Sequence, residues 1–302
     1  MKYWLASVLL RILGLLPLPL AHALAVPLGR LWRFLPWREH PVIHTNLSLC
    51  FPDQTAAWRE RLHRQHLVEM ARLALEAGVV WYGSLRRINR LVRRHQGWQA
   101  VEQAAERGKG ILLVGAHYGN WEILPLWISA RVPVSALYRA PASEALDRTI
   151  TASRQRFGAE LIASGSPAMR RMLARLKRGG LIGLLADQQP KQGEGVFVPF
   201  FGVPALTMTL VNRLARHTGC AVFFASCRRL PRGRGWELSF TSAPEIVSGN
   251  DPCEAMRAFH GWLEQRIGET PAQYLWNYKR FSLRPGGAES PYPPRKRRRR
   301  RT

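Results

Sequence analysis

The sequence predicts an α/β fold, layered around a mostly parallel central sheet and preceded by an N-terminal helical segment that anchors the chain to a membrane. Short apolar runs such as ILLVGA (111–116) and LIGLLA (181–186) alternate with longer amphipathic patterns, as is typical of buried strands linked by helices. An apolar content of 46% over 302 residues is sufficient for a packed core. The anchor is predicted from a long uncharged stretch near the N-terminus.

The uncharged stretch lies between Arg11 and Arg30 and is 18 residues long. One continuous helix of that length reaches about 27 Å, slightly short of the roughly 30 Å hydrocarbon core of a bilayer. Three prolines within it disfavour a straight helix, so we expect a kinked or interfacial anchor over residues 1–37. The competing interpretation is a cleaved signal peptide, because Ala21-His22-Ala23 resembles a cleavage site.

The remaining elements follow from their periodicity. A helix is expected at about 55–82, and further helices at 143–157, 166–179, 207–219 and 251–268. Strands are expected at 111–116, 132–138, 181–186, 220–227 and 236–241, the last two as antiparallel neighbours. Asp251 followed by Pro252 is typical of a helix N-terminus. We assign 38–287 to one catalytic domain and 288–302 to a disordered polybasic tail.

The net charge of +25 predicts an anionic partner. Nucleic acid, an anionic membrane, an acidic carrier protein and a phosphorylated lipid all fit this charge. No helix-turn-helix, zinc-ligand or RNP-type motif is present, and an apolar N-terminus is out of place in a nucleic-acid binder, so we expect no nucleic acid. The four cysteines are scattered without metal-ligand spacing, so we expect reduced thiols, no disulfide and no metal.

The stretch ILLVGAHYGNWE places His117 at the end of a predicted buried strand and Glu122 five residues later. In an open α/β sheet the ligand crevice lies beyond the carboxyl ends of the strands. If Glu122 begins the following helix and Gly119 permits a close turn, the carboxylate can hold one imidazole nitrogen and leave the other as a general base. The spacing alone fits equally well a capping glutamate and a hydrogen-bonded histidine at a strand end.

Several blocks occur together and in order: NLSLCFPD, AHYGNWE, LYRAP, SRQRFGAELI, LADQQPKQGEGVFVPFFGVPALTMT and PAQYLWNYKRFSLRPGG. With them the chain resembles the lipid A biosynthesis acyltransferases, the late lauroyl/myristoyl transferases, from near residue 1 to about Gly287. The resemblance implies a layered αβ acyltransferase fold in which His117 and Glu122 are the catalytic pair of an H-x4-D/E motif. Many relatives have Asp where this chain has Glu122, which leaves the branch and the chain-length preference open.

The resemblance also implies a reaction. A fatty acyl group, expected to be lauroyl, moves from acyl-carrier protein to a hydroxyl of an acyl chain on a lipid A precursor of the Kdo-lipid IVA type. The expected place is the cytoplasmic side of the inner membrane, with anionic membrane lipids as further partners. No cofactor is implied, and we expect a monomer.

Other residues are weaker candidates. Arg154 best matches a basic position of the family and is assigned to the catalytic set, although a solvated helix face explains it equally well. Candidate substrate-binding residues are Tyr138 and Arg139 at a strand end, Arg156, Asp187 and Gln188 after the 181–186 strand, and Lys279 and Arg280 as ligands for acceptor phosphates or sugar acids. Asp187 either orients a basic residue or caps the next turn.

Two other functions fit the same residues. One is an acyl-carrier-protein-dependent transferase that acts on a different hydroxylated lipid. The other is a basic membrane-bound binding protein without turnover. Loss of activity in a folded His117→Ala variant separates an enzyme from a binding protein.

Overall fold

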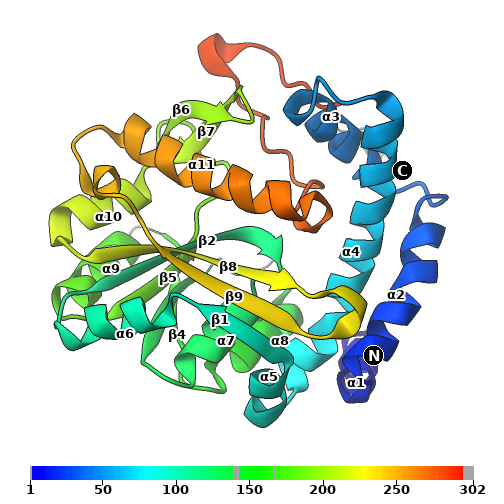
Figure 1. Cartoon of the computed structure of the whole chain (residues 1–302), viewed down its shortest axis with the longest axis horizontal. Helices are drawn as coiled ribbons and strands as arrows, with labels where there is room; N and C mark the ends of the chain where they lie inside the picture. The colour runs from blue at the N-terminus through cyan, green and yellow to red at the C-terminus, as the bar shows by residue number, and fades with distance from the viewer. Residues whose placement is uncertain (1, 139, 141–142, 166, 295–302) are drawn as a thin grey trace, which may run out of the picture.

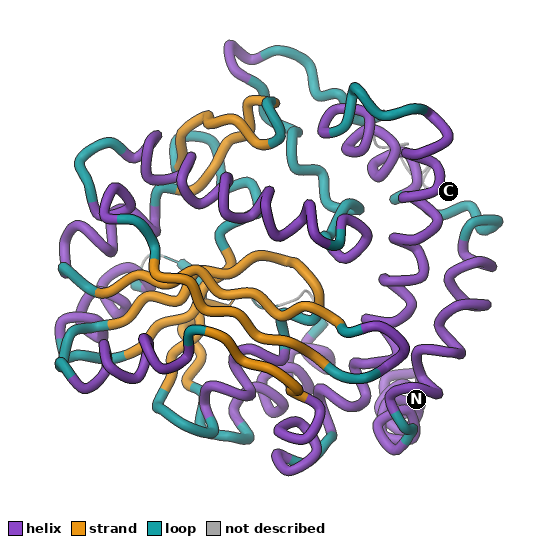
Figure 2. Tube along the Cα trace, in the orientation of Figure 1, coloured by secondary structure: helices purple, strands orange, loops and turns teal. Residues whose placement is uncertain are grey.

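The computed structural model describes residues 2–138, 140, 143–165 and 167–294, with the side chains of all of these except 2–7 and 146. Helices cover both faces of a seven-stranded sheet with the strand order β1-β9-β8-β2-β5-β3-β4 (Figures 1 and 2). Its strands are β1 (Val92–Gln96), β2 (Ile111–Gly119), β3 (Val134–Tyr138), β4 (Glu160–Ala163), β5 (Leu181–Leu185), β8 (Ala221–Arg229) and β9 (Trp236–Ser242). A second, two-stranded sheet pairs β6 (Gly195–Phe200) with β7 (Val203–Met208).

The described helices fall before, between and after these strands. They are α1 (Lys2–Leu15), α2 (Leu18–Trp32), α3 (His40–Cys50), α4 (Ala56–Tyr82), α5 (Leu85–Leu91), α6 (Trp98–Glu106), α7 (Ile123–Ser129), α8 (Glu144–Gln155), α9 (Ala168–Lys177), α10 (Leu210–Thr218) and α11 (Pro252–Glu269). Asp251 caps α11 as predicted, because its side chain accepts the N–H of Cys253 at 2.7 Å.

The sheet confirms the predicted mostly parallel arrangement. Strand β2 pairs in parallel with β5 on one side and β8 on the other, and β3 pairs in parallel with β4 and β5. Strands β8 and β9 are antiparallel, as predicted for 220–227 and 236–241. The central position of β2 places the end of this strand in the middle of the sheet.

Two cores lie on opposite faces of the sheet because successive side chains of β2 point in opposite directions. Leu112 and Val114 join the core that includes residues of α9, α10 and α11. Ile111 and Leu113 join the core that includes residues of α6 and α7. Burial on both faces explains why the strand reads as a continuous apolar run.

Some elements differ from the sequence-based expectation. The helix predicted over 207–219 begins only at Leu210, because Thr207 and Met208 belong to β7. Strand β1 was not predicted, since it carries mostly exposed polar residues and so lacks an apolar pattern. The backbone of β1 joins the sheet through parallel pairing with β9.

The N-terminal region forms two helices, α1 and α2, which lie along the long helix α4 (Figure 1). Gly14 and Gly78 allow α1 to approach α4 closely: a Cβ at Gly14 would lie 2.8 Å from the carbonyl oxygen of Gly78. Among the described residues, no helix combines the length and the apolar character needed to cross a bilayer. The segment that was expected to anchor the chain is divided into two helices between Leu15 and Leu18. Its contact with a membrane stays a prediction.

At the other end, Tyr292 lies in the segment assigned to the tail. Its ring is buried, and its hydroxyl donates to Asn46 Oδ1 at 2.5 Å and accepts the N–H of Phe281 at 3.0 Å. The chain is therefore packed on the catalytic domain as far as this tyrosine. The arginine-rich end, 295–302, lies outside the described residues.

Candidate active site

The end of β2 departs from regular strand geometry where the sequence places the polar pair. The pairing with β5 continues to Gly115, opposite Leu185, and the pairing with β8 shifts register between Gly115 and Gly119. Gly119 has φ +62°, and a Cβ there would lie 1.8 Å from the carbonyl oxygen of Cys227. Only glycine fits this position, as the predicted close turn required.

His117 is held by Asp187. Each residue lies two positions beyond the last paired residues of β2 and β5, so the register brings them together. Asp187 Oδ1 lies 2.8 Å from His117 Nδ1, and Asp187 Oδ2 accepts the backbone N–H of His117 at 3.1 Å. Of the two roles considered for Asp187, the structure therefore shows that of orienting a basic residue.

The carboxylate of Asp187 is buried, with 2% of its side chain exposed, yet it is stabilised as an anion. Burial acts to raise the pKa of Asp187, but the charge of His117 and the two hydrogen bonds outweigh burial and hold the pKa below 3.8. A buried ionised carboxylate on Nδ1 fixes the ring orientation and leaves Nε2 for chemistry.

Glu122 has a different partner from the one expected. It precedes α7, in agreement with the predicted place at a helix start, but its carboxylate accepts hydrogen bonds from Arg154. Arg154 Nε donates to Oε2 at 2.9 Å, and a second guanidinium nitrogen donates to Oε1. Burial acts to lower the pKa of Arg154, but Glu122 outweighs burial and raises it. The motif residues therefore belong to two pairs, His117–Asp187 and Glu122–Arg154.

The free side of His117 faces two further residues. Gln188 Nε2 lies 3.4 Å from His117 Nε2, and the ring of Trp121 makes an edge contact with the imidazole at a centroid distance of 4.9 Å. The His117 side chain is 17% exposed, so a substrate can reach it from outside.

Tyr138 extends the Glu122–Arg154 pair. The Arg154 guanidinium lies 5.3 Å from the centroid of the Tyr138 ring, and the Tyr138 hydroxyl donates to Asp147. Burial and the contact with Asp147 raise the pKa of Tyr138. The neighbouring candidate Arg139 lies outside the described residues.

The remaining basic candidates lie in other contacts. Arg156 donates to the carbonyl of Val80 at 2.6 Å, and burial lowers its pKa to about 10. Arg280 is 2% exposed and donates to the Leu206 carbonyl at 2.6 Å, so it is not presented to a bulky acceptor in this conformation. Lys279 donates to the carbonyl of Pro293 at 3.4 Å. Their binding of substrate stays a prediction.

An apolar cavity of about 90 Å³ lies beside the Glu122–Arg154 pair. Its polar lining consists of Glu122 and Arg154, and the indole of Trp121 contributes next to them. The rest of the lining comes from β2, β3, β5, β8 and α7: Leu113, Gly115, Leu124, Pro125, Ile128, Val134, Ala136, Leu137, Gly183, Leu184, Leu185 and Ala225. A hydrocarbon chain fits such a lining better than a polar ligand does.

Sequence reasoning missed a buried polar network behind the catalytic turn. Glu76 on α4 is fully buried and accepts hydrogen bonds from Asn120 at 2.8 Å, Arg229 at 2.7 Å and His22 at 2.7 Å. Burial acts to raise the pKa of Glu76, but Arg229 and His22 outweigh burial and lower it. A lone glutamate in the apolar run LALEAGVVW was the available signal, because such a charge needs buried partners. The network joins α2, α4 and β8 to the turn between His117 and Glu122.

The chain is similar in sequence to proteins of known family. Residues 1–282 match the family of bacterial lipid A biosynthesis acyltransferases. The chain is 30% identical over 297 residues to lipid A biosynthesis lauroyltransferase of Escherichia coli K12, covering 96% of this chain and 95% of that protein. It is 27% identical over 296 residues to lipid A biosynthesis palmitoleoyltransferase of the same organism, with 96% and 95% covered. A more remote match, phosphatidylinositol mannoside acyltransferase of Mycobacterium tuberculosis, is 27% identical over 182 residues, covering 59% of this chain and 56% of that protein.

The match to the family model extends over most of the chain and includes the two residue pairs and the cavity beside them. The chain therefore belongs to the bacterial lipid A biosynthesis acyltransferases and is a transferase of the EC 2.3.1 class.

Proposed function

We propose that this protein transfers a fatty acyl group from acyl-carrier protein to a hydroxyl of a primary acyl chain on a Kdo-lipid IVA-type precursor, with lauroyl as the preferred group. The observation that carries this proposal is the His117–Asp187 pair, whose imidazole contacts Trp121 in the wall of an apolar cavity. The pair supplies a base, and the cavity supplies a place for the hydrocarbon chain.

In the proposed reaction, His117 Nε2 takes the proton from the acceptor hydroxyl while its oxygen attacks the thioester carbonyl carbon. Asp187 stabilises the imidazolium that forms, because its carboxylate already contacts Nδ1. The tetrahedral intermediate collapses as the carbon–sulfur bond breaks. The thiolate of the carrier protein then takes the proton from His117, which returns the imidazole to its starting state.

Glu122 and Arg154 position the site in this scheme. Their two hydrogen bonds join the start of α7 to α8 at the wall of the cavity. Trp121 lies between this pair and His117, since it lines the cavity and contacts the imidazole ring. The family's H-x4-D/E motif then acts through two linked pairs, with the glutamate placing the turn that carries the histidine.

The acyl chain of the donor is proposed to enter the cavity. Burial of hydrocarbon is favourable by about 0.8 kcal/mol per methylene group, so a cavity of fixed depth discriminates between donor lengths. The 30% identity to a lauroyltransferase favours a C12 donor, while the 27% identity to a palmitoleoyltransferase makes C16 donors the comparison to run.

We place the reaction at the cytoplasmic face of the inner membrane. Among the described residues, ten large apolar side chains are exposed, and eight of them cluster near the N-terminus: Leu9, Ile12, Leu15, Leu20, Leu24, Leu31, Phe34 and Leu35. Water disfavours such a cluster, whereas an interfacial membrane position buries it. The net charge of +25 favours anionic lipids and an acidic carrier protein.

A second acceptor class is supported by one observation. The remote match to a phosphatidylinositol mannoside acyltransferase links this fold to a hydroxylated lipid other than a lipid A precursor. The chemistry at His117 would be the same, and only the acceptor would differ.

The test is transfer of radiolabelled acyl groups from acyl-carrier protein to a purified lipid IVA-type precursor by detergent-solubilised protein. Wild type and His117→Ala are compared across C10 to C16 donors. We expect product from wild type, with a maximum at C12, and none from a folded His117→Ala variant. Absence of product from wild type across all donors contradicts the lipid A acceptor, and the same assay with a phosphatidylinositol mannoside tests the second class.

A further inference from the structure

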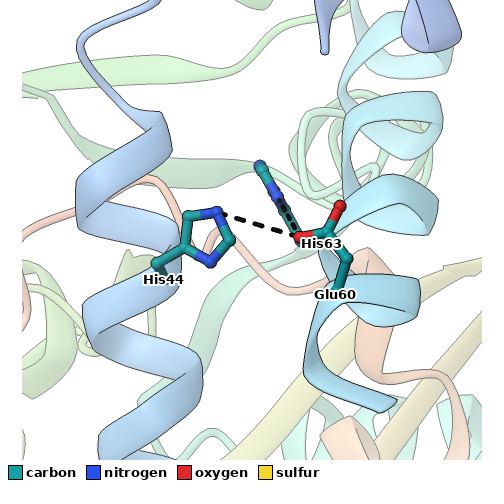
Figure 3. Close-up of side chains that lie close together, drawn as sticks. All are labelled: His44, Glu60 and His63. Carbon is teal, nitrogen blue, oxygen red and sulfur yellow. Dashed lines mark ion pairs between the residues drawn. The ribbon is translucent and has the colours of Figure 1, made fainter. Parts of the chain in front are cut away.

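Two histidines and a glutamate converge between α3 and α4 (Figure 3). His44 comes from α3, and Glu60 and His63 come from the first half of α4. Glu60 Oε2 lies 3.6 Å from His63 Nδ1 and 3.9 Å from His44 Nε2, and the three ligand atoms all lie within 4.8 Å of one another. The other carboxylate oxygen, Oε1, faces Arg33 at 3.8 Å and Arg64 at 3.7 Å, so Oε2 is the one directed at the imidazoles.

The hydrogen bonds behind this cluster fix the tautomer of His63. The carbonyl oxygen of Trp32 can only accept, so His40 Nε2, at 3.1 Å from it, carries a proton. Neutral His40 then accepts at Nδ1 from His63 Nε2, which lies 3.0 Å away. Since neutral His63 carries its proton on Nε2, its Nδ1 is left with a bare lone pair.

This lone pair has no hydrogen-bond partner. His63 is buried, with 4% of its side chain exposed, and its Nδ1 faces the Glu60 carboxylate at a separation beyond hydrogen-bond range. Two electron-pair donors, His63 Nδ1 and Glu60 Oε2, thus face one another 3.6 Å apart.

A divalent transition-metal ion would satisfy all three groups. Zn²⁺ binds histidine nitrogen and carboxylate oxygen at about 2.0 to 2.2 Å, which in tetrahedral geometry sets ligand atoms about 3.4 Å apart. The separations of 3.6 and 3.9 Å to Glu60 Oε2 therefore need only small side-chain movements. His40 would occupy the outer position usual for zinc histidines, accepting the N–H of the ligand His63.

We propose that His44, Glu60 and His63 bind one divalent transition-metal ion of the Zn²⁺ class, with water completing the coordination. The ion links α3 to α4. Through the hydrogen bonds from His63 to His40 and from His40 to the carbonyl oxygen of Trp32, it also links these helices to the last residue of α2. The site is distinct from the His117–Asp187 pair and does not depend on the proposed reaction. Its role is to hold the N-terminal helices on the catalytic domain.

The test uses the tag-free, full-length chain in detergent after treatment with a chelator. Zn²⁺ is titrated by calorimetry, and the thermal unfolding temperature is measured with and without the ion. Two variants remove a ligand at low risk to the fold: His44→Ala, whose side chain is 51% exposed, and Glu60→Gln, which keeps the side-chain shape. His217→Ala, which removes an exposed histidine on α10, is the matched control.

We expect wild type and His217→Ala to bind one equivalent of Zn²⁺ and to unfold at a higher temperature when it is present. Both ligand variants should bind Zn²⁺ at least tenfold more weakly and lose the thermal shift. Equal affinity in wild type and His44→Ala overturns the proposal, as does equal weakening by His217→Ala. Binding of Mg²⁺ in preference to Zn²⁺ overturns it as well.

Discussion

Asp187 holds His117 through two contacts, one to ring Nδ1 at 2.8 Å and one to the backbone N–H at 3.1 Å. Both contacts arise because β2 and β5 are parallel neighbours and each residue lies two positions beyond the paired segment. The same carboxylate therefore places the histidine backbone, orients its ring and selects its tautomer.

Replacing the carboxylate by an amide tests this relationship. In Asp187→Asn an amide N–H can face Nδ1, which shifts the imidazole proton to Nε2 and blocks the base. We expect kcat to fall by roughly three to four orders of magnitude with little change in KM. The measurement is acyl-transfer kinetics, with Asp251→Asn at the N-cap of α11 as the control for the substitution itself. A loss of less than about tenfold contradicts the role of Asp187.

Glu122 and Arg154 are tested together by a double-mutant cycle. If Glu122 acts through Arg154, then Glu122→Gln and Arg154→Gln each lower kcat, and the double variant is little worse than the poorer single variant. If Glu122 instead acts directly on His117, as the motif spacing suggested, the two losses multiply. Circular dichroism and unfolding curves of all three variants check that the fold is retained.

Much of the site was predictable from local pattern. The apolar run 111–116 predicts a buried strand, His117 follows it, and Gly119 and Glu122 occupy the turn and helix start that their residue types favour. These features depend on neighbours within a few residues in the sequence. These features can therefore be predicted from a single sequence.

The partners of His117 and Glu122 were not predictable in the same way. Asp187 is 70 residues from His117, and Arg154 is 32 residues from Glu122. Asp187 follows a predicted strand, and Arg154 lies in the last turn of a predicted helix. Their pairing with His117 and Glu122 depends on which elements are adjacent and on the register of the strands. Strand β1 escaped prediction for a related reason, since its exposed polar residues are held by pairing with β9 and not by burial.

Acid should destabilise the protein beginning near pH 6.5, because two buried histidines are held neutral. Burial lowers the pKa of His66 to about 4, and burial with the charge of Arg280 lowers that of His260 to about 3. Both rings have a pKa near 6.5 when unfolded, so the unfolded state binds more protons below that pH. Their contribution to stability is complete above pH 6.5 and falls by roughly 1 kcal/mol per pH unit for each ring as the pH drops toward the folded pKa values.

Urea unfolding at a series of pH values measures this slope. His66→Gln should reduce the slope between about pH 6 and pH 4.5, whereas His217→Gln, at an exposed position, should leave it unchanged. A free energy of unfolding that is constant over this range in wild type contradicts the assignment.

Gly183 should set the length of acyl chain that the cavity accepts. It lines the cavity from β5, and a Cβ added there meets no atom within 4 Å, so a larger side chain extends into the free space. Gly183→Val should exclude roughly two methylene groups, which corresponds to about 1.5 kcal/mol and lowers the C12 to C10 preference about tenfold. Gly261→Val, on α11 and also without a close neighbour, is the matched control. An unchanged donor preference would place the acyl chain elsewhere.

Glu76 should be the most costly carboxylate to remove from the interior. It is fully buried and forms an ion pair with Arg229, which is itself 3% exposed, so Glu76→Ala leaves this buried cation with only the longer contact of 3.5 Å to Glu69. We expect a loss of about 3 to 5 kcal/mol in the free energy of unfolding. The exposed Glu194→Ala should change the free energy of unfolding by less than about 0.5 kcal/mol.

Because Asn120 lies between His117 and Glu122 and donates to Glu76, the conservative Glu76→Gln should lower kcat even where the protein remains folded. Wild-type kcat in a folded Glu76→Gln variant would show that the network supports the fold without positioning the catalytic turn.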